Sequence, residues 1–237
     1  MTEFHIDGTT DPFIRAELEA GESIAAERDS MASMSGTIDL AGKARGGVLK
    51  SLVRSATTGE SFFMQEITAT RGSGTVMLSP RHPGEVRVIE LRDDSWLLAD
   101  GAYLASDQSL DLKTIRNKSV GAAVFGGTGG FFMLAVEGTG TLCISGVGAV
   151  HEMSIEPGET LVVDSGHAVA WPASLTMKAS LSTGQGGGIL GKVVGSAKSG
   201  EGVVLRFEGG ETGGTILVSS RSRESYAAWM SELLPGD

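Results

Sequence analysis

Short apolar and β-branched runs, separated by glycine-rich or acidic turns, fill most of the chain. Residues 75–78 (TVML) follow Gly72 and Gly74, and residues 215–218 (TILV) follow Gly213 and Gly214. Runs this short, rich in β-branched residues and bounded by glycine, are typical of strands rather than helices. The pattern therefore predicts a mainly β protein.

The same order of apolar runs and turns occurs three times. The first half of each copy is an apolar residue, a short acidic or glycine turn, an apolar run, a polar turn and another apolar run: LEAGESIAAERDSMASMS from Leu18, LRDDSWLLADGAYLASDQS from Leu91 and IEPGETLVVDSGHAVAWPAS from Ile155. The second half is typical of a β-hairpin: SFFMQEITATRGSGTVMLS from Ser61, GFFMLAVEGTGTLCISG from Gly130 and GVVLRFEGGETGGTILVSS from Gly202. We therefore expect three pseudo-repeats, at about residues 14–81, 84–146 and 148–221, within a single domain of residues 1–237.

The end of the chain has a different periodicity. In SRESYAAWMSELL, Tyr226, Trp229, Met230 and Leu233 have the spacing of one helix face. Ser222 is a suitable N-cap, and Pro235 with Gly236 ends the pattern. We expect a helix over about residues 222–234 that packs its aromatic face on the β body.

Composition narrows the class of partner. The 237 residues include 35 glycines and 6 prolines, which favours many tight turns over a disordered linker. The net charge is −10, with 19 basic residues and no basic cluster, so nucleic acid is not expected as a partner. The single cysteine, Cys143, is compatible with a reducing compartment. The sequence has no signal-peptide pattern at its start and no apolar run long enough to span a membrane, so we expect a cytoplasmic protein.

A family resemblance rests on GGTGGFFMLAVEGTGTL, VDSGHAVAW, GAYLAS and LVSSRSRESYAAWM, taken in order. With these motifs the chain resembles the mitochondrial biogenesis family named for altered inheritance of mitochondria, whose bacterial members are of unknown function. The likeness extends from about Ile14 to Leu234. It implies a fold like that of the tryptophan RNA-binding attenuator protein: an all-β sandwich of the double-stranded β-helix type, with three repeats about a pseudo-threefold axis. It implies no catalytic residues, and the mitochondrial role of fungal members does not carry over to a sequence without a transit-peptide pattern.

One stretch suggests a metal site. PGETLVVDSGHAV, around His167, resembles the second cupin motif, and His151 with Glu152 lies 16 residues earlier. An open metal site needs about three protein ligands, which these residues would supply. However, the H-x-H pair typical of cupins is missing, and the repeat alignment places Tyr103 and Ser30 or Met31 opposite His167. The sequence therefore favours a structural turn histidine, with metal binding by His167, His151 and Glu152 as the alternative.

Two phenylalanine pairs are candidates for an interface. Phe62 with Phe63 and Phe131 with Phe132 occupy matched repeat positions. Adjacent strand residues point to opposite faces, so one ring of each pair needs a cover, supplied either by the sandwich itself or by another subunit. No catalytic constellation or cofactor motif accompanies them. We therefore expect an uncharacterised, non-enzymatic scaffold or adaptor that self-associates or binds other proteins. The alternative is a cupin-like protein that binds a small ligand or a metal.

Overall fold

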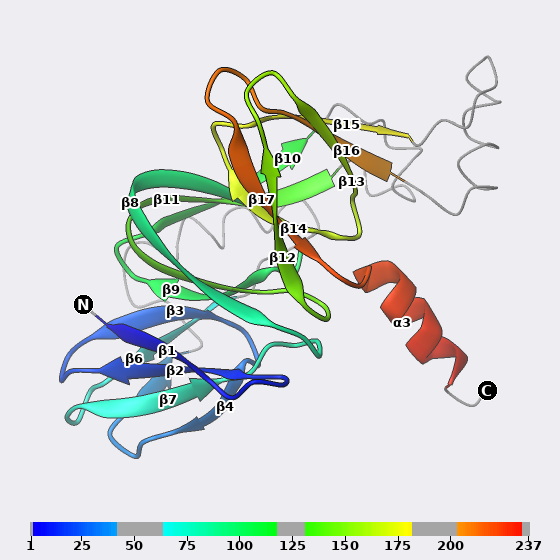
Figure 1. Cartoon of the computed structure of the whole chain (residues 1–237). Coiled ribbons are helices and arrows are strands. Elements are labelled where there is room, and N and C mark those ends of the chain that lie inside the picture. The colour runs from blue at the N-terminus through cyan, green and yellow to red at the C-terminus, as the bar shows by residue number, and fades with distance from the viewer. Residues whose placement is uncertain (1, 42–63, 118–130, 182–202, 234–237) are drawn as a thin grey trace.

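The computed structural model describes residues 2–41, 64–117, 131–181 and 203–233 (Figure 1). These residues form antiparallel strands and a C-terminal helix, so the all-β class with one terminal helix is confirmed. The elements are β1 (Glu3–Asp7), β2 (Phe13–Leu18), β3 (Ser23–Glu27), β4 (Met31–Met34), β5 (Asp39–Ala41), β6 (Met64–Thr68), β7 (Gly74–Leu78), β8 (Val86–Ala99), β9 (Tyr103–Asp107), β10 (Asp111–Asn117), β11 (Phe131–Ser145), β12 (Val150–Ile155), β13 (Thr160–Asp164), β14 (Ala168–Pro172), β15 (Thr176–Leu181), β16 (Val203–Glu208), β17 (Gly214–Ser219) and α3 (Arg223–Glu232).

Strand pairing follows one scheme in three successive segments, residues 13–78, 86–145 and 150–219. In the first segment β7 lies between β2 and β4, and β6 lies between β3 and β5. In the third, β17 lies between β12 and β14, and β16 lies between β13 and β15. In the second, the long strands β8 and β11 replace two strands each: β11 pairs with β8 from Met133 to Ser145, with β10 over its first half and with β9 near its end.

The same bulge interrupts one strand of each segment. The register shifts between Met31 and Ser33 in β4, and between Ala168 and Ala170 in β14. In β9 the neighbouring pairs are Ile144 with Tyr103 and Cys143 with Ala105. Each strand thus carries one extra residue at the same place, namely Ala32, Leu104 and Val169. A bulge bends its strand and increases the local twist.

The segments join through two kinds of strand. We call β4, β9 and β14 the leading strands, and β3, residues 95–99 of β8, and β13 the trailing strands. Leading strand β9 pairs with trailing strand β3, and leading strand β14 pairs with the trailing part of β8. These two junctions connect the segments into a sheet that runs from β12 to β5.

The apolar interior is divided among the segments. One cluster centres on Ile14, Ile24 and Val76 of the first segment, a second on residues of β8 and β11, and a third on Trp171 and Phe207. The Trp171 and Phe207 rings are both fully buried and meet edge to face, with centroids 5.2 Å apart. Burial of this kind is the main stabilising term of the fold.

Helix α3 begins as expected but does not pack as expected. Ser222 is its N-cap and its hydroxyl accepts a hydrogen bond from the Ser225 N–H group, while Glu224 lies in the first turn. However, no residue of α3 is buried, and Trp229 is 52% exposed. The prediction that its aromatic face covers the β body was therefore wrong. Figure 1 shows the helix standing beside the strands rather than across them.

Within the described ranges, no helix is long and apolar enough to cross a membrane.

Candidate functional site

His167 lies in the turn between β13 and β14. Its backbone N–H donates to the carbonyl oxygen of Asp164 at 3.0 Å, and its carbonyl accepts from the N–H of Ser219 at 2.8 Å. Its ring Nδ1 lies 2.8 Å from the Ser219 carbonyl oxygen, which can only accept, so Nδ1 carries the proton. The ring thus links the turn to the end of β17.

The corresponding turns of the other segments hold different residues at the His167 position. The backbone N–H of Ala102 donates to the carbonyl oxygen of Ala99, and its own carbonyl accepts from the N–H of Ser145. In the same way, the N–H of Ser30 donates to the Glu27 carbonyl, and the Ser30 carbonyl accepts from the N–H of Ser79. The residue opposite His167 in the second segment is therefore Ala102, one position before the Tyr103 expected from the sequence. The backbone bonds are the same whichever side chain occupies the position, which fits a structural turn.

His151 and Glu152 do not join His167. Both are exposed on β12, where they pair with Val218 and Leu217 of β17. As neighbours on one strand they point to opposite faces, so they cannot both face one ion. Among the described residues, the acidic and histidine side chains whose ligand atoms lie within 4.8 Å of one another are a different set.

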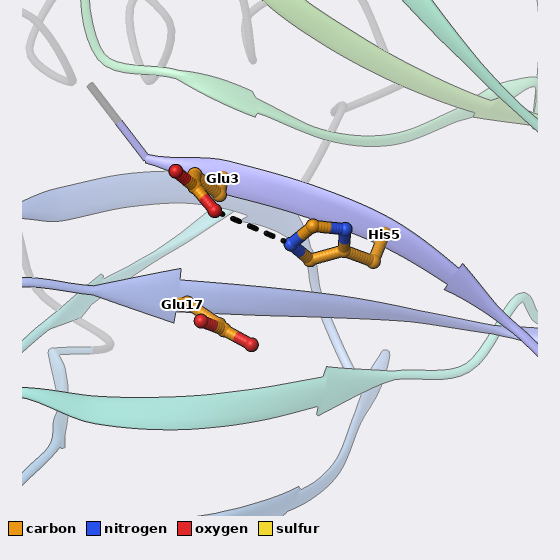
Figure 2. A group of neighbouring side chains, drawn as sticks. All are labelled: Glu3, His5 and Glu17. Carbon is orange, nitrogen blue, oxygen red and sulfur yellow. Dashed lines mark ion pairs between the residues drawn. The ribbon is translucent and has the colours of Figure 1, made fainter.

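That set is Glu3, His5 and Glu17, on the hairpin of β1 and β2 (Figure 2). Glu3 pairs directly with Glu17, and His5 is two residues further along the same face, with its Nε2 3.5 Å from a Glu3 carboxylate oxygen. The sequence signal was the alternation of Glu3 and His5 on one strand, which becomes meaningful only once the hairpin register brings in Glu17. Arg15 forms an ion pair with Glu17, and none of the three side chains is buried. The cluster therefore lacks the enclosure of a typical metal centre.

A small hollow lies between the turns of the second and third segments and the start of α3. It encloses about 60 Å³ and is lined by Asp100, Gly166 and Arg223, among others. A guanidinium nitrogen of Arg223 lies 2.5 Å from the Asp100 carboxylate, so both charges are already paired. Burial, with Arg223 nearby, lowers the pKa of His82 in its wall. Ligand pockets usually enclose about 300–1,000 Å³, so this hollow suits ordered water rather than an organic substrate.

A wider hollow of about 470 Å³ borders the turn after β1 and the start of β8. Its ionisable side chains are Asp11 and Glu85. The Glu85 carboxylate already accepts from the Val150 N–H group at 2.8 Å and pairs with Arg87 at 2.9 Å. Among the described residues, the lining includes no histidine, cysteine or lysine.

Three ionisable groups whose pKa values are raised by burial lie in the interior. Burial raises the pKa of the Tyr103 hydroxyl, which donates to the Ala25 carbonyl oxygen at 3.0 Å. Burial also raises the pKa of the Cys143 thiol, which is fully enclosed. Asp107, whose pKa is raised by burial, accepts from the Thr141 N–H group at 2.8 Å. None of these three side chains lines either hollow.

The phenylalanine prediction lies largely outside the described structure. Phe62 and Phe63 fall outside the described residues. Phe131 and Phe132 begin β11, where their backbones pair with Asn117 and Arg116, but their side chains are not described. Their role at an interface therefore stays a prediction.

Comparison with known proteins agrees with the resemblance seen in the sequence. The sequence profile of the family described as mitochondrial biogenesis AIM24 matches residues 4–221. An uncharacterized protein of Streptococcus pyogenes serotype M6, M6_Spy0233, is 31% identical over 230 residues, which cover 94% of this chain and 87% of that protein. The crystal structure of protein SPYM3_0169 from Streptococcus pyogenes, 30% identical, superposes with a TM-score of 0.79 and covers 99% of this chain and 100% of that one. The likeness to the attenuator protein stays a prediction. With a match across nearly its whole length, the chain belongs to the mitochondrial biogenesis AIM24 family.

Proposed function

We propose that this protein is a non-enzymatic scaffold or adaptor of the cytoplasm that assembles with copies of itself. The observation that supports it most is the recurrence of one strand-pairing scheme, with its bulge, in three segments. We interpret these segments as the three pseudo-repeats of the sequence, each a unit with one leading and one trailing strand.

Among the described residues, one leading strand and one trailing strand form no junction with another segment. Three leading and three trailing strands make two internal junctions, β9 with β3 and β14 with β8. Within the described residues, leading strand β4 pairs with β7 alone and trailing strand β13 pairs with β16 alone. An open strand edge is a template for another strand, and proteins that stay monomeric usually block it with charge, proline or a cover.

The side chains around the two hollows favour binding over catalysis. Asp100, Arg223 and Glu85 are committed to ion pairs, and the described histidines lie apart from one another in separate elements. The cupin-like alternative has less support, because His151 and Glu152 point to opposite faces of their strand and His167 is engaged by Ser219.

The test is the mass of the purified protein in solution. Light scattering after a sizing column, run over a wide range of loading concentrations, should give multiples of the 24.5 kDa chain that grow with concentration. A single mass of one chain at every concentration would refute self-assembly. Metal analysis of the same fractions tests the alternative: stoichiometric metal that is lost in His167→Ala would make the cupin-like function the better proposal.

A further inference from the structure

We propose that copies of this chain join head to tail, with β4 of one copy paired to β13 of the next in the antiparallel register Ser33–Val163, Met34–Val162 and Ser35–Leu161. This inference rests on the proposed function and specifies its contact. The occupant of each open edge is a second copy of this chain, because the chain already makes the same junction with itself.

The register follows from the two internal junctions. Glu27, Ala99 and Asp164 are equivalent, because the backbone carbonyl of each accepts the hydrogen bond of its turn. Ser30, Ala102 and His167 are equivalent, because the N–H group of each donates that bond. At both junctions, the leading-strand residue of the pair lies three positions after Ala102 or His167. Its partner in the trailing strand lies one position before Glu27 or Ala99. The pairs are Ala105 with Ala26 and Ala170 with Leu98. The same rule, applied to the open strands, pairs Ser33 with Val163 and hence Met34 with Val162.

The backbone groups on the two open edges agree with this register. Ser35, the residue after β4, donates its N–H to Thr75 at 2.9 Å, so beyond the bulge Ser33 and Ser35 bond to β7 and Met34 does not. Ser165 donates to Val203 at 2.9 Å, so the odd-numbered residues of β13 bond to β16. Since alternate residues of a strand bond to opposite neighbours, Met34 and Val162 direct their N–H and C=O groups outward. The proposed register places these two outward residues opposite each other.

Exposure gives independent support. Leading strand β9 is buried throughout and β14 nearly so, whereas β4 is exposed along most of its length. Met34 is 38% exposed and Val162 is 47% exposed, although both are large apolar residues. The equivalents of Met34 at the internal junctions, Ser106 and Trp171, are completely buried. The equivalents of Val162 are the buried Ala25 and the partly buried Leu97. Pairing with a second copy would cover Met34 and Val162 in the same way.

The geometry of this contact implies an open-ended assembly. β4 and β13 lie at opposite ends of the molecule in Figure 1, and the two surfaces that meet are different. A contact between unlike surfaces is heterologous, so it leaves one free edge at each end of a dimer and closes only if the rotation between copies forms a ring.

Proximity is tested by cross-linking variants that each add one surface cysteine to the buried Cys143. Met34→Cys and Val162→Cys are mixed in equal amounts and treated with a short bismaleimide. The parent chain is the background control, since Cys143 is completely buried. A covalent dimer in the mixture, and little in either variant alone, is the expected result. A chain that carries both substitutions should give covalent oligomers; if it gives only an internal link within a monomer, the two edges close within one chain and the proposal is wrong.

Charge variants test whether the contact drives assembly. Met34→Lys and Val162→Lys should each weaken association roughly tenfold, because a lysine on an edge strand opposes pairing. The matched controls are Met153→Lys, at a methionine 42% exposed on β12, and Ile6→Lys, at a residue 47% exposed on β1. The double variant M34K/V162E should regain much of the lost association, because it places opposite charges across the contact, whereas M34K/I6E should not.

The outcomes separate this inference from the proposed function. Oligomers that form equally well in the edge variants and in their controls would overturn the β4–β13 contact and leave self-assembly standing. A parent chain that stays monomeric at all concentrations, together with no cross-link between Met34→Cys and Val162→Cys, would overturn both.

Discussion

The carboxyl group of Glu27 contributes stability that is lost as the pH rises, which is the opposite of the usual effect of a carboxyl group. Burial raises its pKa to about 7 from the ordinary value of 4.5; Arg81 and Arg223 lower the pKa by less, and Asp100 and Asp29 raise it slightly further. The folded chain therefore keeps this proton over a pH range in which the unfolded chain has lost it. Stability from this group is complete below about pH 4.5, and it falls as the pH rises through 7.

The size of the effect follows from the shift. A difference of 7 − 4.5 = 2.5 units corresponds to at most about 3.4 kcal/mol at 1.36 kcal/mol per unit. The Glu27 side chain is only partly buried, so solvent screens the effect, and we expect about 1–2 kcal/mol.

Urea unfolding at pH 5 and pH 8, at one fixed protein concentration, measures this contribution. The parent chain should lose about 1–2 kcal/mol more unfolding free energy between the two pH values than Glu27→Gln does. Glu152→Gln, at an exposed position on β12, controls for the general effect of removing one negative charge from an acidic protein. If the parent and Glu27→Gln show the same pH dependence, or if the parent gains stability relative to the variant, the reasoning about Glu27 is refuted.

Three further predictions concern packing. Phe207→Ala should cost about 3–5 kcal/mol of unfolding free energy, because the ring is fully buried against Trp171; chemical denaturation will show it, and a cost below 1 kcal/mol would contradict the packing. The Cys143 thiol should not react with a thiol reagent in native buffer and should react fully in urea, since it is buried and its pKa is raised; rapid native labelling would be the contrary result. Gly84→Ala should cost at least about 2 kcal/mol, because Gly84 has φ +157° and a Cβ there would lie 2.0 Å from the Gly146 carbonyl oxygen; an unchanged melting temperature would argue against this close approach.

Local features of the fold were accessible from the sequence, while contacts between segments were not. Glycine-bounded β-branched runs predicted β7 and β17, and Ser222 predicted the start of α3. The pairing of β9 with β3 depends on how the segments sit in space, which no local pattern encodes.

The sites show the same division. Alternation along a strand already implied that His151 and Glu152 face opposite ways, so that half of the metal hypothesis could have been tested on the sequence. The meeting of Glu3, His5 and Glu17 required the register of a hairpin, and the exposure of Trp229 required knowing where α3 lies relative to the strands.

The extra residue in β4, β9 and β14 makes these strands intolerant of changes in length. Because side chains alternate between faces, removal of Val169 would shift every following residue of β14 by one place and turn the buried Trp171 toward the opposite face. An open surface loop can absorb an added residue at small cost. Insertions and deletions in relatives should therefore gather in the turns and avoid positions 32, 104 and 169, so that an alignment of many relatives would reveal the three bulges as a fixed count of residues.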